Sequence, residues 1–194
     1  MFSGKIEDYI LFEDKEIIVC RKPAGIAVQN ARIGAMDLES SLKNYLAMQD
    51  GGGRRIPYLA VIHRLDQPVE GILVFGKTPE AAKSLSAQIT AGKMEKIYLA
   101  VTYGKQAEAG KKEKVLEDYL KKDGKSNTSS VVNAHTPGAK KARLSYEVLG
   151  EAVDAISGKK KWLLRIHLDT GRHHQIRVQM AHAGMPLAGD RKYG

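Results

Sequence analysis

Residues 95–103 read EKIYLAVTY, and in this stretch the side chains alternate with a period of two. That period is typical of a β-strand, because successive side chains of a strand point to opposite faces of its sheet. We expect Ile97 and Leu99 to face the core and Lys96 and Tyr98 to lie together on the other face. The stretch therefore predicts a strand with one buried side.

A second alternating stretch, WLLRIHL at residues 162–168, predicts another strand. Its buried side is expected to carry Trp162, Leu164, Ile166 and Leu168. Further predicted strands are residues 17–20, 59–62, 71–75 and 143–149, and predicted helices are residues 37–48, 78–92 and 172–183, the first two capped by Asp37 and Thr78. This order predicts an α+β fold with a mixed, mostly antiparallel central sheet and flanking helices.

The 194 residues are 43% hydrophobic and 27% charged, which predicts one globular domain spanning residues 1–194. Cys20 is the only cysteine, so an intramolecular disulfide is excluded. The sequence contains neither a signal peptide nor a run of the ~18 apolar residues that a membrane span needs. We expect a cytoplasmic protein without a membrane partner; its oligomeric state is open, with a monomer as the expectation.

The net charge is +9, from 31 Lys and Arg against 22 Asp and Glu. Residues 105–143 hold ten Lys or Arg and five Asp or Glu, so more than half of the excess lies there. Strand-like pieces at 115–120 and 131–135 flank a polar tip at 124–130, which predicts an exposed basic hairpin arm. A basic segment fits nucleic acid or an anionic membrane surface, and general solubility is the plain alternative.

Familiar cofactor and metal motifs are missing from the sequence. It contains no glycine-rich dinucleotide loop, no phosphate-binding loop and no His-Glu-x-x-His. The adjacent His173 and His174 would point in different directions on a helix and make a poor metal pair. We therefore expect no cofactor and no metal.

Two polar clusters remain as candidate sites. HRLD at residues 63–66 follows a predicted strand, where its carboxylate could serve catalysis or could simply cap a turn. TGRHHQIR at residues 170–177 begins a predicted helix with a concentration of cations, a pattern that also fits a solvated face or a phosphate clamp. Arg177 lies one turn beyond His173 and His174, so these three are predicted to share a helix face.

Together the clusters resemble the motifs of the RluA-type pseudouridine synthases. The resemblance rests on HRLD at 63–66 with GIL at 71–73, KIY at 96–98, TGRHHQIR at 170–177, and GD at 189–190 with YG at 193–194, and RKPAG at 21–25 resembles the family's opening strand and turn. It implies the pseudouridine synthase fold and an isomerase that converts uridine to pseudouridine in structured RNA, either rRNA or tRNA, without a metal or cofactor.

The resemblance also implies catalytic roles. Asp66 is the implied essential carboxylate, which attacks the sugar C1′ or removes a proton from C2′; the sequence leaves both routes open. Arg177 is the implied guanidinium that keeps this acid ionised in a dry pocket, with Arg172 as the second choice. Tyr98 is implied to pack against the uracil and to help move the C5 proton, with ordinary strand packing as its alternative.

Substrate binding requires the uridine to be flipped out of its stack, and Arg64 is implied to enter the space that the base leaves. Phosphate contacts are expected from the basic hairpin and from Arg54 and Arg55. The other residues expected to bind substrate are His63, Leu65, Lys96, Arg172, His174, Gln175 and Ile176.

The sequence departs from the family pattern in two places. Val69 and Glu70 stand where Thr and Ser usually precede the glycine, and the chain stops at Gly194, where further strands normally follow. We expect those last strands, and a preceding S4 domain, to be absent. A non-catalytic RNA-binding module of the same shape is the main alternative; a nucleoside hydrolase commonly needs two carboxylates, and no second acid stands in a matching motif.

Overall fold

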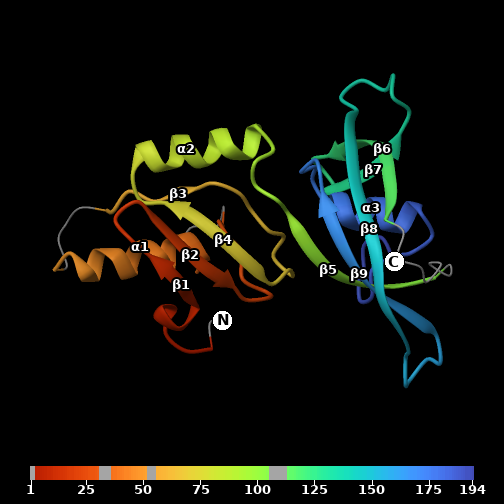
Figure 1. The fold of residues 1–194 in the computed structure, drawn as a ribbon, viewed down its shortest axis with the longest axis horizontal. Helices are drawn as coiled ribbons and strands as arrows, with labels where there is room; N and C mark the ends of the chain where they lie inside the picture. The colour runs from red at the N-terminus through yellow and green to blue at the C-terminus, as the bar shows by residue number, and fades with distance from the viewer. Residues whose placement is uncertain (1–2, 31–35, 52–55, 105–112) are drawn as a thin grey trace. The chain divides into compact units, whose positions relative to one another are not determined.

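The computed structural model describes residues 3–30, 36–51, 56–104 and 113–194 (Figure 1). Arg54, Arg55 and residues 105–112 of the basic segment lie outside the described residues. The chain divides into two compact units, Met1–Lys93 and Met94–Gly194, each with its own hydrophobic core. That the two act as one catalytic domain stays a prediction.

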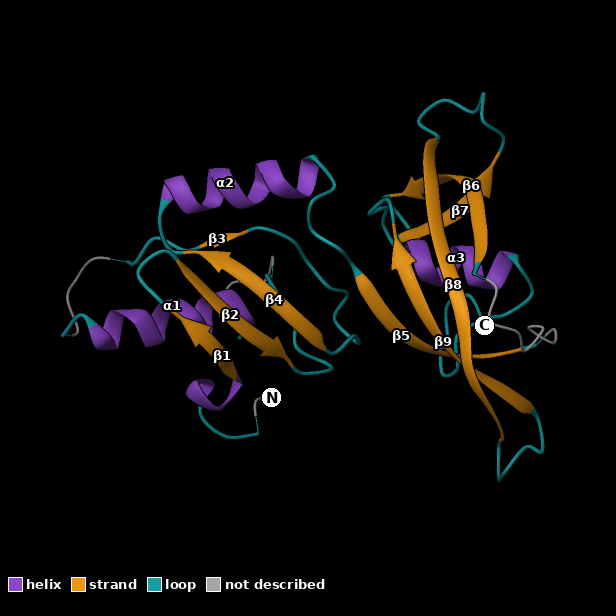
Figure 2. Ribbon diagram, in the orientation of Figure 1, coloured by secondary structure: helices purple, strands orange, loops and turns teal. Residues whose placement is uncertain are grey.

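The first unit contains a four-stranded sheet with the order β1-β2-β4-β3 (Figure 2). Its elements are η1 (Ile6–Tyr9), β1 (Ile10–Glu13), β2 (Ile17–Lys22), α1 (Leu38–Gln49), β3 (Ala60–Val61), β4 (Gly71–Gly76) and α2 (Pro79–Thr90). Every strand pair among them is antiparallel. The strand predicted at 59–62 is thus a two-residue strand, and the chain leaves the sheet before the HRLD segment.

One face of this sheet forms the core against α1. Ile18 pairs with Phe75 and Cys20 with Leu73, and all four side chains are fully buried together with the apolar residues of α1, Leu38, Leu42 and Leu46. The helix begins where predicted, because the Asp37 carboxylate accepts a 2.7 Å hydrogen bond from the backbone N–H of Ser40.

Helix α2 lies against β4 and β3. A Cβ at Gly76 would lie 2.9 Å from the backbone nitrogen of Ala82, so only glycine permits this close approach of strand and helix. Thr78 caps the helix as predicted, and its hydroxyl accepts a hydrogen bond from the N–H of Ala81. α1 thus packs in the core of the first unit, whereas α2 approaches the sheet closely at the end of β4.

The second unit contains a five-stranded antiparallel sheet with the order β5-β9-β8-β6-β7. Its elements are β5 (Ile97–Tyr103), β6 (Lys114–Asp123), β7 (Thr128–Val132), β8 (Lys140–Val153), β9 (Lys160–Leu168) and α3 (Gln175–His182). The predicted buried side of residues 162–168 is confirmed, because all four of its apolar side chains lie in the core with Met180 of α3.

The face assigned to β5 is wrong, although its alternation is correct. Ile97 is 56% and Leu99 67% exposed, whereas Tyr98 and Ala100 pack on the core. The pairing with β9 explains the reversal, because Tyr98 lies opposite the buried Ile166 and so shares its face. Because β5 carries apolar side chains on both faces, its sequence does not indicate which face is buried.

The basic hairpin exists, but it is not a free arm. β6 and β7 pair from Tyr119↔Val132 to Asp123↔Thr128, and β6 also pairs along β8, so the hairpin is the edge of the sheet. The α+β class is confirmed, with two antiparallel sheets among the described residues in place of one central sheet. No helix in these residues is long and apolar enough to cross a membrane.

The register of β9 predicts unequal losses of stability when either of two neighbouring leucines is replaced. Leu164→Ala should lower the free energy of unfolding of the second unit by about 2–5 kcal/mol, because it leaves a cavity in the core. Leu163→Ala, on the exposed face, should change it by less than about 0.5 kcal/mol. Urea unfolding followed by the fluorescence of Trp162, the only tryptophan, measures both. Equal losses would contradict the register.

Candidate active site

Asp66 lies in the loop that joins β3 to β4. The strand ends at Val61, and the backbone carbonyl of Asp66 accepts a 3.0 Å hydrogen bond from the N–H of Val69, which closes a turn. The residue is half-buried. The turn predicted at this acid is present, but it begins five residues after the end of β3 and not directly at a strand end.

The other residues of the HRLD segment divide between the core and the surface. His63 is half-buried, and its Nε2 accepts a 3.3 Å hydrogen bond from the N–H of Val74 in β4. Leu65 packs against the core, over Gly71, where an added Cβ would come within 2.8 Å of the leucine side chain. Arg64 is exposed, so its guanidinium is accessible to a ligand.

Lys22, a residue that the sequence analysis did not single out, holds the Asp66 loop in place. Its side chain has no exposed surface. The Nζ donates to the carbonyls of Pro23 (3.0 Å), Ile26 (2.7 Å) and Gln67 (3.0 Å). An ammonium has three hydrogens, so the three carbonyls match its donors and offset part of the cost of burial.

The same two segments are joined by backbone and side-chain hydrogen bonds. The N–H of Gly25 donates to the carbonyl of Gln67 at 2.8 Å, and the Gln67 side-chain amide donates to the carbonyl of Gly25 at 3.0 Å. Burial lowers the pKa of Lys22, and the negative charges of Asp66 and Glu70 act against that shift. The buried ammonium is therefore an electrostatic neighbour of Asp66 as well as an anchor for its loop.

In the second unit, α3 begins three residues later than predicted, at Gln175. His174 has a φ of +53°, a left-handed conformation that interrupts the helix geometry and is uncommon for a non-glycine residue. Gln175 organises the preceding loop: its Oε1 accepts from the hydroxyl of Thr170 (2.8 Å) and the N–H of Arg172 (2.9 Å). The Gln175 side chain is buried, so it shapes this loop from within.

The two histidines lie outside the helix, so the helix face predicted for them with Arg177 is wrong. Their rings stack with centroids 3.7 Å apart. His173 hydrogen-bonds Ser129 (2.8 Å) and Asn127 (3.1 Å) of the β6–β7 hairpin, whereas His174 Nδ1 hydrogen-bonds the hydroxyl of Tyr193 at 2.7 Å. The histidine pair thus links the helix start to the hairpin and to the C-terminal segment.

Arg177 projects from α3 onto that same C-terminal segment. Its Nε and Nη2 each donate a 2.7 Å hydrogen bond to the carboxylate of Asp190, and its Cζ lies 5.0 Å from the centre of the Tyr193 ring. These hydrogen bonds are the main reason that the pKa of Asp190 is lowered to about 2. Ile176, the residue before Arg177, packs on the core with Met180.

Tyr98 is the second residue of β5, and Lys96 directly precedes the strand. Tyr98 packs on the core of the second unit. Burial lowers the pKa of the half-buried Lys96, while Asp169 acts to raise it and Arg172 to lower it further. Arg172 is exposed, and its Nε donates to the carbonyl of Lys141 at 2.8 Å.

Each unit therefore carries its own part of the predicted site. The first contributes His63, Arg64, Leu65 and Asp66, and the second contributes Lys96, Tyr98, Arg172, His174, Gln175, Ile176 and Arg177. Among the described residues, no group of three or more His, Cys, Asp or Glu side chains is arranged to hold a metal ion. No role was predicted for Lys22, Asp190 or Tyr193, although Lys22 lies in RKPAG, Asp190 in the GD pair and Tyr193 in the YG pair.

Comparison with known proteins gives consistent matches along the chain. The family model described as RNA pseudouridylate synthase matches residues 16–182. Ribosomal large subunit pseudouridine synthase D of Xylella fastidiosa is 33% identical over 192 residues, covering 95% of this chain and 51% of the relative. tRNA pseudouridine synthase C of Haemophilus ducreyi is 33% identical over 189 residues, covering 95% and 73%.

A solved structure shares the fold. Human RNA Pseudouridylate Synthase Domain Containing 4 superposes with a TM-score of 0.75 at 23% identity, covering 97% of this chain and 70% of that one. The chain spans about half the length of several curated relatives that it matches, including the Xylella protein.

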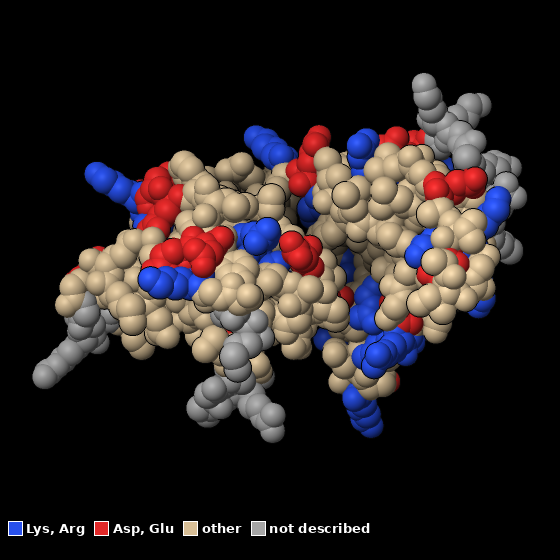
Figure 3. Space-filling view, turned by 90° about the horizontal axis from the view of Figure 1, so that it is seen from below, with Lys and Arg blue, Asp and Glu red and all other residues tan. Residues whose placement is uncertain are grey.

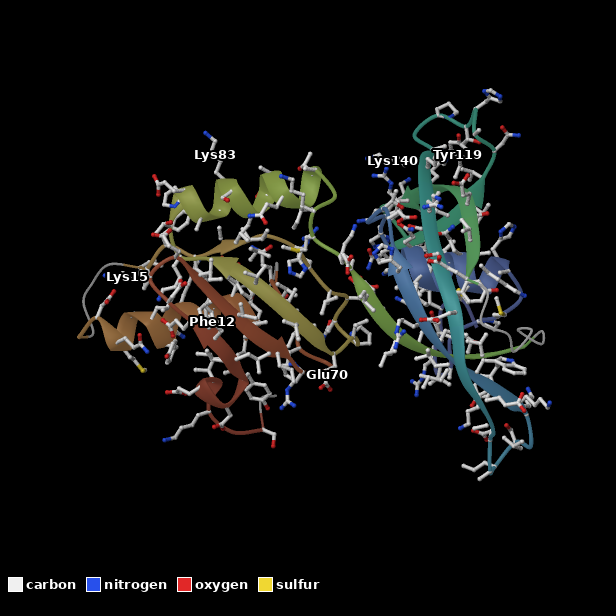
Figure 4. All side chains as sticks on the ribbon, viewed as in Figure 1. Phe12, Lys15, Glu70, Lys83, Tyr119 and Lys140 are labelled. Carbon is white, nitrogen blue, oxygen red and sulfur yellow. The ribbon has the colours of Figure 1, made fainter. Side chains whose placement is uncertain are left out.

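Replacing Lys22 tests the anchor of the Asp66 loop. Lys22→Met keeps the bulk but leaves three carbonyls without this donor, so the local opening free energy should fall by about 1–3 kcal/mol. The backbone N–H of Gly25, which donates to the carbonyl of Gln67, should then exchange its hydrogen with solvent faster, as measured by amide hydrogen exchange. Lys83→Met is the control, because Lys83 is exposed on α2 (Figure 4). Unchanged protection at Gly25 would contradict the anchor.

Proposed function

We propose that this chain, which belongs to the RNA pseudouridylate synthase family, isomerises uridine to pseudouridine within RNA. The family match over residues 16–182 carries the proposal, because it includes the HRLD, KIY and TGRHHQIR segments. The local geometry supports it, since a buried cation holds the loop of the half-buried Asp66. Relatives of similar identity are named for large-subunit ribosomal RNA and for tRNA, and we propose one of these as substrate.

The reaction breaks the bond between N1 of uracil and C1′ of the sugar and forms a bond between C5 and the same C1′. Asp66 acts as the nucleophile at C1′ or as the base at C2′. Both roles require the ionised carboxylate, which burial opposes and a neighbouring guanidinium favours. We assign that guanidinium to Arg177. C5 loses a proton and N1 gains one, so the composition is unchanged and no net oxidation occurs. These side chains therefore need no cofactor.

Tyr98 is assigned to the uracil, against which its ring packs, and to the late transfer of the C5 proton. Arg64 is exposed beside Asp66 in the chain, where its planar cation can stack in the space left by a flipped base. His63, Leu65, Gln175 and Ile176 support the two motif loops through the hydrogen bonds and packing already described. Lys96 and His174 complete the proposed substrate-binding residues.

Phosphate contacts are assigned to a cationic surface of the second unit. The face of the molecule drawn in Figure 3 carries Lys and Arg in small groups among Asp and Glu. Two contacts connect its parts: Arg172 Nε with the carbonyl of Lys141, and Lys192 Nζ with the carbonyl of Asn127 at 2.9 Å. The cationic surface consists of the exposed residues Lys121, Lys122, Lys125, Lys140, Lys141, Arg172 and Lys192. A sequence-independent contact of this kind suits a polyanionic backbone.

Removing the charge of Asp66 tests the catalytic assignment. Asp66→Asn should slow pseudouridine formation by at least about 10³-fold, because neither the nucleophile nor the base remains. RNA affinity should change little. The measurement is release of tritium from C5-labelled uridine in RNA, and Glu70→Gln in the same loop is the control.

The products also separate the alternative functions. A binding module would give no turnover with the wild-type chain, and a hydrolase would release free uracil instead of pseudouridine. Full activity of Asp66→Asn would exclude this acid from the chemistry.

The cationic surface predicts a steep salt dependence of RNA binding. The logarithm of the binding constant should fall linearly with the logarithm of salt concentration. Replacing Lys121 and Lys122 together by alanine should reduce the slope by about 1–2, whereas Lys83→Ala on α2 should leave it unchanged. Filter binding from low to moderate salt measures the slopes. Identical slopes for all three proteins would remove the hairpin from the RNA interface.

A further inference from the structure

In the turn after α3, the buried carboxylate of Asp190 accepts hydrogen bonds from four N–H donors. The Asp190 side chain is only 4% exposed. Its oxygens accept from Arg177 Nε and Nη2 at 2.7 Å each, from the backbone N–H of Lys192 at 2.9 Å and from that of Tyr193 at 3.3 Å. The backbone contacts close the turn on Oδ1, and the remaining contacts hold the arginine.

The pair fixes the orientation of the guanidinium. Because Asp190 engages Nε and Nη2, it occupies the side-on edge of the planar group. The orientation of the end-on edge, formed by Nη1 and Nη2, is then fixed, and this is the edge that a second anion would contact. The Tyr193 ring beside the guanidinium further limits its rotation.

We propose that Asp190 is a positioning residue that holds Arg177 side-on, so that the end-on edge of the guanidinium addresses the catalytic carboxylate. The proposal rests on the proposed function, in which that carboxylate is Asp66. Asp190 touches neither substrate nor reacting atoms in this scheme and acts through Arg177. The buried carboxylate also offsets the charge of the arginine, so the orientation of the guanidinium, rather than its bare charge, is what Asp190 supplies.

Tyr193, in the same turn as Asp190, connects this pair to other parts of the second unit. The hydroxyl of Tyr193 accepts the N–H of Ser129 in β7 at 2.8 Å and hydrogen-bonds His174 at 2.7 Å. One short turn thus joins the arginine, the left-handed residue before α3 and the β6–β7 hairpin. The low pKa of Asp190 keeps the carboxylate charged throughout the neutral range.

Asp190→Asn separates positioning from closure of the turn. Asparagine keeps an oxygen for the N–H groups of Lys192 and Tyr193, but it presents an NH₂ group to Arg177 Nε–H. The single-turnover rate constant with saturating protein should fall at least about tenfold, while the Kd for RNA stays within about threefold. In an Arg177→Lys background, where the bidentate pair is already lost, the same change should cost less than about twofold.

A matched control comes from the β8–β9 turn. Asp154 also closes a turn by accepting backbone N–H bonds, there from Ile156 and Ser157, and pairs with the cation of Lys161 at 2.8 Å. Asp154→Asn should keep the wild-type rate constant. A wild-type rate for Asp190→Asn, or an equal loss in both backgrounds, would overturn the positioning role. Absence of pseudouridine from the wild-type reaction would instead overturn the proposed function.

Discussion

The conformation of the loop that carries Asp66 depends on the buried ammonium of Lys22. Lys22 ends an alternating strand on its core side, and the buried ammonium must find acceptors there or destabilise the fold. The carbonyls that satisfy it come from the following turn and from Gln67, so the cost of burying the charge is offset only when the two loops meet. Asp66 precedes Gln67 directly. The constraint that satisfies a buried cation therefore also fixes the backbone at the proposed catalytic acid.

Much of the fold could be predicted from local patterns. The starts of the helices at Asp37 and Thr78 follow from cap chemistry, and the buried side of β9 follows from its alternation. Among the predictions that failed, two have a clear physical reason. β5 carries apolar side chains on both faces, so only its pairing with β9 decides which face is covered. The late start of α3 depends on the left-handed backbone conformation of His174. Because this residue is not a glycine, the sequence does not indicate that conformation.

The residues of the candidate site could be predicted from the sequence, but the residues that hydrogen-bond to them could not. HRLD and TGRHHQIR identify Asp66 and Arg177 as residues of interest. The Arg177–Asp190 pair spans a separation of thirteen residues, from a helix to a tight turn, and no helical or strand period links such positions. Lys22 escaped notice for a different reason: an alternating pattern that ends in lysine ordinarily places the charge in solvent. Partners of buried charges are set by tertiary contacts and become visible only in the folded chain.

The buried Cys20 gives the first unit a chemical reporter of its own. Burial raises the pKa of this thiol to about 12, so almost none of the reactive thiolate forms near neutral pH while the sheet is closed. An alkylating reagent would consume the sole cysteine only through opening of that unit, whereas the sole tryptophan resides in the other. The two natural labels can thus time the opening of each half separately, and any lag between them would measure how cooperatively the chain comes apart.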